Sequence, residues 1–170
     1  MKKIYITGIS GTGKTTIAKK LAEQGFCAIS IDEVLDLCFW INKQTKEKIT
    51  IEVELNKDFI DAHDWVCDIE SLKNLINKQG AELIFVLGIA ANQNDFLNLF
   101  DEVLLLQCSP ETFIARIENR TDNDFGKDKT AQETILNSYQ AFEKEMLERG
   151  ATPINVEGSI DEVVEKILKI

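Results

Sequence analysis

The sequence predicts an α/β protein built on a five-stranded parallel sheet with helices on both faces. Five short apolar runs alternate along the chain with segments of helical periodicity. These runs are apolar at nearly every position, as in strands that are buried on both faces, instead of alternating with polar residues. The length of 170 residues is typical of a single domain. We therefore expect one domain that spans residues 1–170.

The first half of the chain contains three of these strands, separated by two helices. An apolar stripe from Ile17 to Ala22 predicts a helix that stops at Gly25. A second stripe predicts a helix over Asp68–Gln79, followed by Gly80. The five predicted strands of the whole chain are Lys3–Thr7, Phe26–Ile31, Leu83–Leu87, Glu102–Gln107 and Thr152–Val156.

Three further helices are predicted in the second half. Ser109 followed by Pro110 is typical of a helix start. A long apolar stripe that begins near Thr130 predicts a helix that ends at Gly150. Ser159 and Glu162 have the spacing of a capping box.

Two stretches, 33–67 and 121–129, do not fit the alternation of strands and helices. Residues 49–55 alternate like an edge strand, yet their charged neighbours also suit a surface helix. The sequence leaves these two alternatives open.

Charge and apolar content exclude several classes of protein. The 29 acidic and 19 basic residues give a net charge of −10, which opposes binding to nucleic acid. The longest apolar run, 83–91, is about half of a membrane span. The four cysteines lack the C-x-x-C spacing of zinc or redox sites, which favours buried, reduced thiols. We expect a cytoplasmic protein, and the sequence makes no prediction of its oligomeric state.

The segment from Gly8 to Thr15 matches the phosphate-binding pattern G-x-x-x-x-G-K-[ST] at every fixed position, between a predicted strand and a predicted helix. Its glycines let backbone N–H groups surround an anion, and the helix N-terminus adds positive potential. Lys14 can reach the β- and γ-phosphates of a nucleotide, and the Thr15 hydroxyl can bind Mg²⁺. The alternative is a glycine-rich turn. The predicted nucleotide-binding residues in this segment are Gly8, Ser10, Gly11, Thr12, Gly13, Lys14, Thr15 and the adjacent Thr16.

A carboxylate is expected beside this loop. Asp32 follows the second predicted strand, and ligands of parallel sheets bind outside the carboxyl ends of the strands. Asp32 can accept the proton of an attacking hydroxyl or hold Mg²⁺. Alternatively, it caps a helix that starts near Glu33. The guanine-reading N-K-x-D and the D-x-x-G of GTPases are absent, which disfavours a GTPase.

Two of the three arginines, Arg116 and Arg120, lie four residues apart on one predicted helix and share a face. A polar segment follows them, and we expect a lid at 119–130 that brings cations to the γ-phosphate. The alternative is surface pairing with Glu111 or Glu118. Arg149 is interpreted as a favourable charge at a helix C-terminus.

The sequence resembles the small P-loop kinases related to adenylate kinase and shikimate kinase. The resemblance rests on three motifs: the phosphate loop, the acidic residue after the second strand, and the R-x-x-x-R before a lid. The resemblance covers the whole chain and implies a three-layer P-loop NTPase fold with strand order 2-3-1-4-5. It also implies an acceptor-binding insertion at 33–67. Arg116 would lie near the adenine, Arg120 would contact the phosphates of ATP, and residues 155–158 would border the base.

The sequence departs from this family at the acceptor. Residues 33–100 contain no arginine, which related kinases use to bind an acceptor phosphate or carboxylate. His63 could contact the acceptor or be an ordinary surface histidine, and Asn92 could bind the acceptor or cap a helix. Between residues 51 and 70 there are seven acidic residues and one basic residue. This composition favours an uncharged acceptor, or the acidic residues are simply a solvated face. Lys57, Lys73 or Lys78 could instead bind a monophosphate.

These observations predict an ATP- and Mg²⁺-dependent kinase that phosphorylates a nucleoside-, sugar- or nucleotide-like small molecule. Its predicted catalytic residues are Lys14, Asp32 and Arg120, and its predicted Mg²⁺ ligands are Thr15 and Asp32. The alternative function is an ATPase switch that acts on a protein partner. We expect neither nucleic acid nor membrane as a partner.

Overall fold

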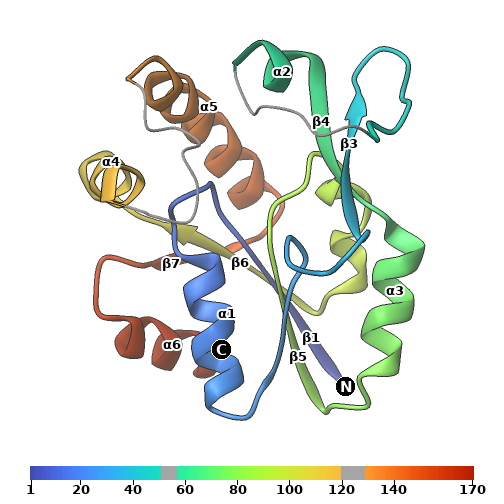
Figure 1. Cartoon of the computed structure of the whole chain (residues 1–170). Helices are drawn as coiled ribbons and strands as arrows, with labels where there is room; N and C mark the ends of the chain where they lie inside the picture. The colour runs from blue at the N-terminus through green and yellow to red at the C-terminus, as the bar shows by residue number, and fades with distance from the viewer. Residues whose placement is uncertain (51–56, 120–128) are drawn as a thin grey trace.

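A computed structural model describes residues 1–50, 57–119 and 129–170, and its centre is a five-stranded parallel sheet (Figure 1). The strand order β2-β5-β1-β6-β7 is the predicted 2-3-1-4-5 order, because β3 and β4 lie in a separate two-stranded sheet. The central sheet consists of β1 (Lys2–Thr7), β2 (Cys27–Ser30), β5 (Leu83–Leu87), β6 (Glu102–Gln107) and β7 (Thr152–Asn155). All five predicted strands are therefore confirmed: β5 and β6 have the predicted bounds, and the ends of the other three differ by at most one residue.

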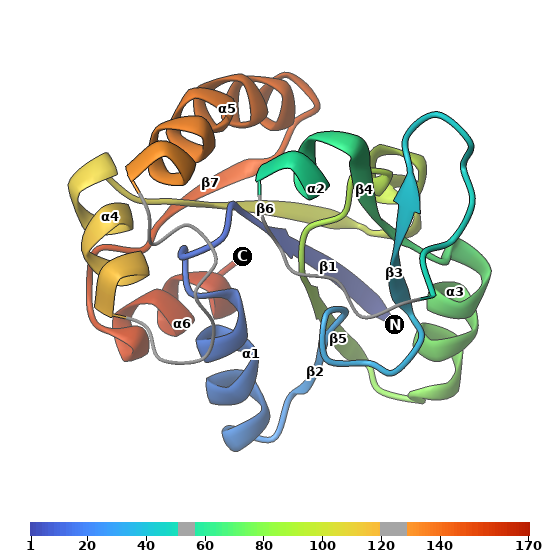
Figure 2. The same ribbon diagram turned by 45° about the horizontal axis from the view of Figure 1, so that its top comes forward.

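Helices cover both faces of the sheet, which confirms the three-layer architecture (Figures 1 and 2). On one face, Ile4 and Ile6 of β1 pack with α1, α4 and α6. On the other face, Tyr5 of β1 packs with α3 and the short segment before β6. The helices are α1 (Lys14–Glu23), α2 (Lys57–Ala62), α3 (Ile69–Lys78), α4 (Pro110–Asn119), α5 (Lys129–Glu148) and α6 (Ile160–Leu168).

The helix ends are fixed by local hydrogen bonds. The Ser159 hydroxyl accepts from Glu162 N, and the Glu162 carboxylate accepts from Ser159 N, so the predicted capping box is present. Before α4, the Ser109 hydroxyl accepts from Thr112 N at 3.2 Å. Between β5 and β6, the segment after Asn92 forms two 3₁₀ turns, η1 (Gln93–Asp95) and η2 (Leu97–Leu99).

Among the described residues, no helix is long and apolar enough to cross a bilayer.

The insertion between β2 and α3 is an antiparallel hairpin formed by β3 (Cys38–Asn42) and β4 (His63–Cys67), with α2 leading into β4. Trp40 lies directly opposite Trp65 in this pairing. The alternative strand or helix over 49–55 falls largely outside the described residues. The base of the hairpin is held to the main domain, because Asp68 N donates to Leu37 O and Ala91 N donates to Trp65 O.

A buried polar network fixes the end of β1. The hydroxyls of Thr7 and Tyr5 both donate to Oε1 of Gln93, at 3.0 and 3.2 Å. All three side chains are buried. Burial raises the pKa of Tyr5 well above its usual value, so the phenol remains a neutral donor. The network therefore connects Thr7, the last residue of β1, to Gln93 in η1.

The carboxyl end of β5 approaches the residue after β2 very closely. A Cβ atom on Gly88 would lie 2.1 Å from Cγ1 of Ile31. Ile31 is fully buried, and its backbone N–H donates to Leu87 O at 2.9 Å. Only glycine fits at this position without displacing Ile31, the residue that precedes Asp32.

We expect Gly88→Ala to lower the free energy of unfolding by about 1–3 kcal/mol, because overpacking forces the neighbouring side chain out of position. Urea denaturation measures the change. Ile31→Ala should cost less in the Gly88→Ala background than in the wild type, because it removes the atoms that clash. Additive costs of the two substitutions would contradict the proposed close approach.

Candidate functional site

The segment between β1 and α1 forms a tight loop with its backbone turned inward. Gly11 and Gly13 adopt φ values of +88° and +96°, which disfavour any other residue. The Thr12 hydroxyl donates to Ile9 O at 2.8 Å and is buried. A Cβ atom on Gly8 would lie 2.8 Å from this hydroxyl. The glycines therefore permit the loop, and the Thr12 hydroxyl stabilises it from within.

The Lys14 side chain folds back into this loop. Its ammonium donates to Gly8 O at 2.6 Å and to Ile9 O at 3.0 Å. Burial lowers the pKa of Lys14 to about 8, and the nearby Asp32 carboxylate opposes that shift. A cation with a lowered pKa inside a loop of backbone groups is suited to bind an anion, because an anion would stabilise its charged form.

The other polar residues at the start of α1 are Ser10, Thr15 and Thr16. Ser10 is half-buried in the loop, whereas Thr15 and Thr16 are exposed in the first turn of α1. The exposed hydroxyl of Thr15 and the exposed carboxylate of Asp32 are hard oxygen ligands of the kind that Mg²⁺ prefers. The residues present therefore fit a magnesium ion that is bound together with nucleotide phosphates.

Asp32 lies in a turn after β2, and the alternative interpretation as a helix cap is wrong. Residues 31–37 form turns in place of a helix, with Glu33 N donating to Ser30 O and Leu37 N donating to Val34 O. Within this segment Asp36 adopts a φ of +58°, which a right-handed helix does not allow, so the turns do not continue as a helix. The carboxylate is exposed, and its Oδ1 accepts from the indole Nε1 of Trp65 at 3.0 Å.

Trp65 is a site residue that the sequence analysis missed. It comes from β4, 33 positions after Asp32. The indole rings of Trp65 and Trp40 lie 5.3 Å apart, and Phe59 packs against Trp40 at 5.2 Å. The only signal in the sequence was the pair of tryptophans itself, and the antiparallel register that opposes them is not a local property.

Arg116 joins the phosphate loop to the segment after β7. Its guanidinium donates to Thr12 O at 3.4 Å and to Val156 O at 2.5 Å. Within the described part of the chain, the guanidinium binds these two carbonyl groups and forms no ion pair with Glu111 or Glu118, which was the alternative. Arg116 therefore lies between the phosphate loop and residues 155–158, which the resemblance expects to border the base.

The segment after β7 is also held to α4. Oε1 of Glu157 accepts from Ser109 N at 3.0 Å and from the Thr112 hydroxyl at 3.2 Å. Hydrogen bonds from Ser109 and Thr112 lower the pKa of Glu157 to about 2. Residues 155–158 thus form an anchored loop beside Arg116.

The remaining arginines are Arg120 and Arg149. Arg120 and nearly all of the expected lid at 119–130 lie outside the described residues. Arg149 forms an ion pair with Glu145 at 3.1 Å, one turn earlier on α5. Its interpretation as a helix-terminal charge agrees with this position.

Asn92 and His63 have structural partners. The Asn92 side chain accepts from Cys67 N and donates to Cys67 O, both at 2.9 Å, so it ties β4 to the loop after β5. It makes no side-chain cap, which shows that the helix-cap alternative is wrong. His63 stacks on Phe59 at 4.0 Å, and its Nδ1 donates to Phe59 O at 2.7 Å.

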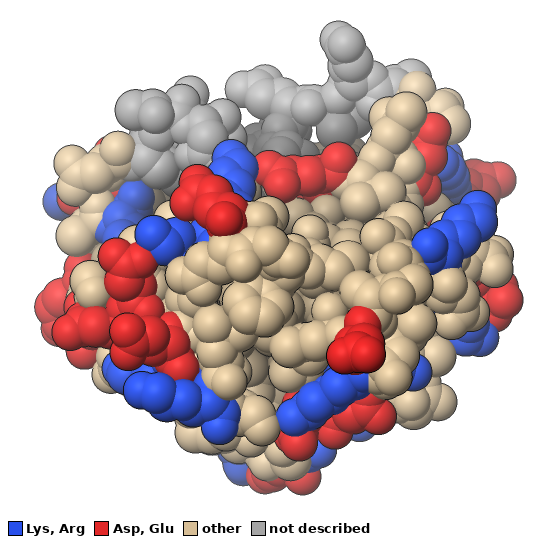
Figure 3. All heavy atoms as spheres, turned by 90° about the horizontal axis from the view of Figure 1, so that it is seen from below, with Lys and Arg blue, Asp and Glu red and all other residues tan. Residues whose placement is uncertain are grey.

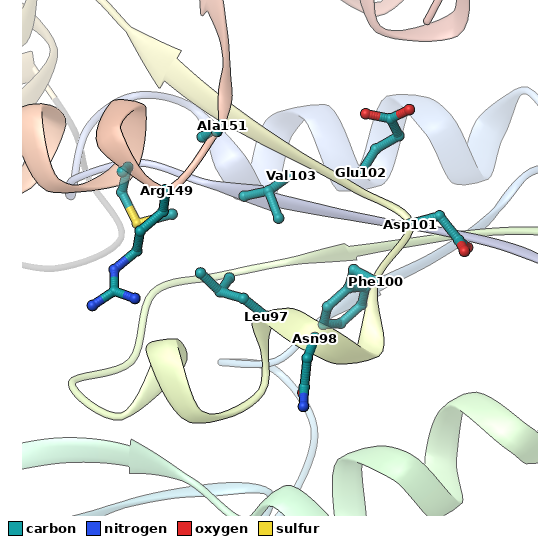
Figure 4. A pocket seen from close by; sticks show the side chains of 10 residues that line it. Leu97, Asn98, Phe100, Asp101, Glu102, Val103, Arg149 and Ala151 are labelled. Carbon is teal, nitrogen blue, oxygen red and sulfur yellow. The ribbon is translucent and has the colours of Figure 1, made fainter.

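Two cavities lie away from the phosphate loop. One, of about 330 Å³, lies at the amino edge of the sheet and is lined by residues that include Leu97, Val103 and Arg149 (Figure 4). Acidic and basic side chains both surround that edge of the molecule (Figure 3). The other cavity, of about 520 Å³, is lined by residues that include Phe39 and Val66. Their side chains point to one face of the hairpin, and those of Trp40 and Trp65 point to the other. Neither cavity contains Lys14 or Asp32.

One family model and several curated kinases are similar to this chain over most of its length. The model of the AAA domain family matches residues 4–137. A probable thymidylate kinase of Sulfolobus acidocaldarius is 29% identical, with 98% of this chain and 94% of that protein covered. A putative adenylate kinase of Methanocaldococcus jannaschii is also 29% identical, with 97% and 85% covered. A dephospho-CoA kinase of Bordetella avium is 25% identical, with 92% and 86% covered.

Solved structures share the fold. TT1252 from Thermus thermophilus superposes with a TM-score of 0.59 at 18% identity, covering 99% of this chain and 94% of that one. Deoxyadenosine kinase from M. mycoides with bound dATP gives a TM-score of 0.54 at 18% identity, covering 99% and 98%.

The lowered pKa of Lys14 predicts that nucleotide binding takes up a proton. In the free protein Lys14 is mostly neutral above pH 8, whereas phosphate groups would stabilise its charged form. At pH 8.5 we therefore expect uptake of roughly half a proton or more per bound ATP, and weaker binding as the pH rises further. Calorimetry in buffers of low and high ionisation enthalpy measures the uptake.

The matched control is Lys19→Met, because Lys19 lies on the same helix with a side chain that is 67% exposed. This variant should show the same proton uptake as the wild type. Equal binding heats of the wild type in the two buffers at pH 8.5 would rule out the buried, neutral lysine.

Proposed function

Since the chain belongs to the AAA domain family and is a small P-loop phosphotransferase, we propose that it transfers the γ-phosphoryl group of ATP to an uncharged, hydroxyl-bearing small molecule. The observation that carries this proposal is the joint position of Lys14 and Asp32. A cation within the glycine-rich loop and an exposed carboxylate lie close enough for the carboxylate to act on the pKa of the lysine. A kinase needs these two groups, one for the phosphates and one for the acceptor hydroxyl.

ATP would bind along the carboxyl edge of the sheet. In this proposal the inward backbone of Gly8–Gly13 and the Lys14 ammonium hold the phosphates. Arg116 lies beside the loop and contacts the segment at Val156, so the adenine would lie near it. We assign Arg120 to the phosphates and 119–130 to a lid from the sequence and the resemblance.

In the reaction we propose, Asp32 is the general base. The acceptor oxygen forms a bond to the γ-phosphorus while the bond from that phosphorus to the β,γ-bridging oxygen breaks. ADP leaves with the electron pair, and the proton of the acceptor hydroxyl moves to the Asp32 carboxylate. Thr15 would hold a magnesium ion directly and Asp32 would hold it through water, and the ion would neutralise phosphate charge when it is bound.

The acceptor would contact the hairpin insertion at 33–67, and the charges there favour an uncharged molecule. No arginine occurs between residues 33 and 100. Lys43 donates to the carbonyl groups of Ile60 and Asp61, and Lys73 forms a 2.6 Å ion pair with Glu70. Lys78 lies at the far end of α3 from the hairpin. We infer that a nucleoside-like or sugar-like acceptor fits better than a nucleoside monophosphate.

The compartment is part of the same proposal. The four cysteines, Cys27, Cys38, Cys67 and Cys108, are all free thiols, and three of them are buried. Free thiols are stable under reducing conditions. We propose that the enzyme works in the cytoplasm, where ATP is available.

The test of the activity is product analysis with γ-labelled ATP and a panel of nucleosides, nucleotides and sugars. We expect label in a small molecule, and Asp32→Asn should lower kcat by about 10²–10⁴-fold with little change in melting temperature. Asp161→Asn is the control, because it removes an exposed carboxylate of α6 that pairs with Lys20. Release of inorganic phosphate alone, with no labelled acceptor, would favour an ATPase.

The acceptor charge is tested by comparing each nucleoside with its own 5′-monophosphate, and each sugar with its phosphate. We expect kcat/KM to be at least ~10-fold higher for the uncharged member of the preferred pair, because the insertion offers no bidentate guanidinium. Efficient phosphorylation of a monophosphate whose parent nucleoside does not react would refute this choice.

A further inference from the structure

The hydrogen bond between Trp65 and Asp32 connects the hairpin insertion to the proposed general base. We propose that Trp65 is a positioning residue: its indole holds one oxygen of the Asp32 carboxylate and leaves the other for the acceptor hydroxyl. The inference rests on the proposed function, because it assigns Trp65 a role through Asp32. The sequence analysis assigned no role to this tryptophan.

Asp32 needs such a partner because its own surroundings do little to orient it. The residue is exposed and lies in a turn, without a helix that its side chain could cap. Within the described part of the chain, Nε1 of Trp65 is the only hydrogen-bond donor to its carboxylate. The bond engages Oδ1, and Oδ2 has no hydrogen-bond partner among the described residues. A carboxylate held at one oxygen retains the second for proton transfer.

Trp65, in contrast, is held on several sides. Its carbonyl oxygen accepts from Ala91 N at 2.7 Å, in the loop after β5. Two residues later, the backbone of Cys67 is tied to Asn92 by two hydrogen bonds. The indole packs at 5.3 Å from Trp40, which lies directly opposite in the hairpin. A side chain whose backbone and ring are both fixed can restrict the rotation of a flexible neighbour.

The same contact links the acceptor insertion to the reaction centre. Asp32 follows β2 in the main sheet, whereas Trp65 belongs to the hairpin that would bind the acceptor. A displacement of the hairpin would break the 3.0 Å hydrogen bond and release the carboxylate. The orientation of the base would therefore depend on the position of the acceptor-binding element.

A double-mutant cycle tests whether Trp65 acts through Asp32. Trp65→Phe keeps an aromatic ring but removes the donor, so we expect kcat to fall about 10-fold or more while the acceptor KM changes less than about twofold. In the Asp32→Asn background, the same substitution should change kcat by less than about twofold. Trp40→Phe is the matched substitution in the opposing residue, and its effect should be equal in the two backgrounds.

Several outcomes would overturn the inference. These are an unchanged kcat in Trp65→Phe, a loss confined to KM, or an equal loss of kcat in the wild-type and Asp32→Asn backgrounds. A wild-type protein that transfers no phosphoryl group would instead overturn the proposed function, and with it this inference. An active wild type with an unaffected Trp65→Phe variant overturns the inference alone.

The contact itself is tested without activity by ¹H–¹⁵N NMR. The chain has two tryptophans, so the wild type should give two indole Nε1–H signals, and Trp40→Phe assigns the one from Trp65. Asp32→Ala removes the acceptor, and the Trp65 indole proton should then move upfield while that of Trp40 stays in place. An unchanged Trp65 signal would show that the indole does not bind Asp32, which overturns the inference even if Trp65→Phe fails to fold.

Discussion

The parallel pairing of β1 with β5 and β6, and of β5 with β2, is the constraint on which the candidate site depends. The register places Ile6 opposite Leu87, and Leu87 opposite Ser30, so the three strands end at the same edge. Each strand is buried on both faces by its apolar side chains, and its polar loop is left at the edge. The phosphate loop, the turn with Asp32 and the glycine after β5 therefore lie together although they are far apart in the sequence.

Among the described residues, Lys14, Asp32 and Arg116 are the charged side chains that contact or act on the phosphate loop. Lys14 lies inside the loop with a pKa of about 8, and Asp32 is the carboxylate that most favours its charged form. Arg116 is engaged with two backbone carbonyl groups and so fixes the loop to the segment after β7.

Those parts of the fold that depend on local pattern could be predicted from the sequence, and those that depend on distant pairing could not. Apolar runs and glycine spacing located all five strands of the sheet and the phosphate loop, and the position of Asp32 followed from the end of β2. The sequence left open whether Asp32 caps a helix, and the turns at 31–37, with Asp36 at a φ of +58°, show that it does not. The Trp65–Asp32 contact and the tie from Asn92 to Cys67 also needed the hairpin register. The role of Arg120 stays a prediction, since it lies outside the described residues.

The central claim is that the loop around Lys14 is the binding site for nucleotide phosphates. The most direct measurement is a crystal structure of the protein with Mg²⁺ and a non-hydrolysable ATP analogue. We expect the Lys14 ammonium to leave the carbonyl groups of Gly8 and Ile9, where it now donates at 2.6 and 3.0 Å, and to contact phosphate oxygens within the loop. An analogue bound elsewhere, with Lys14 still hydrogen-bonded to Gly8 O, would contradict the account.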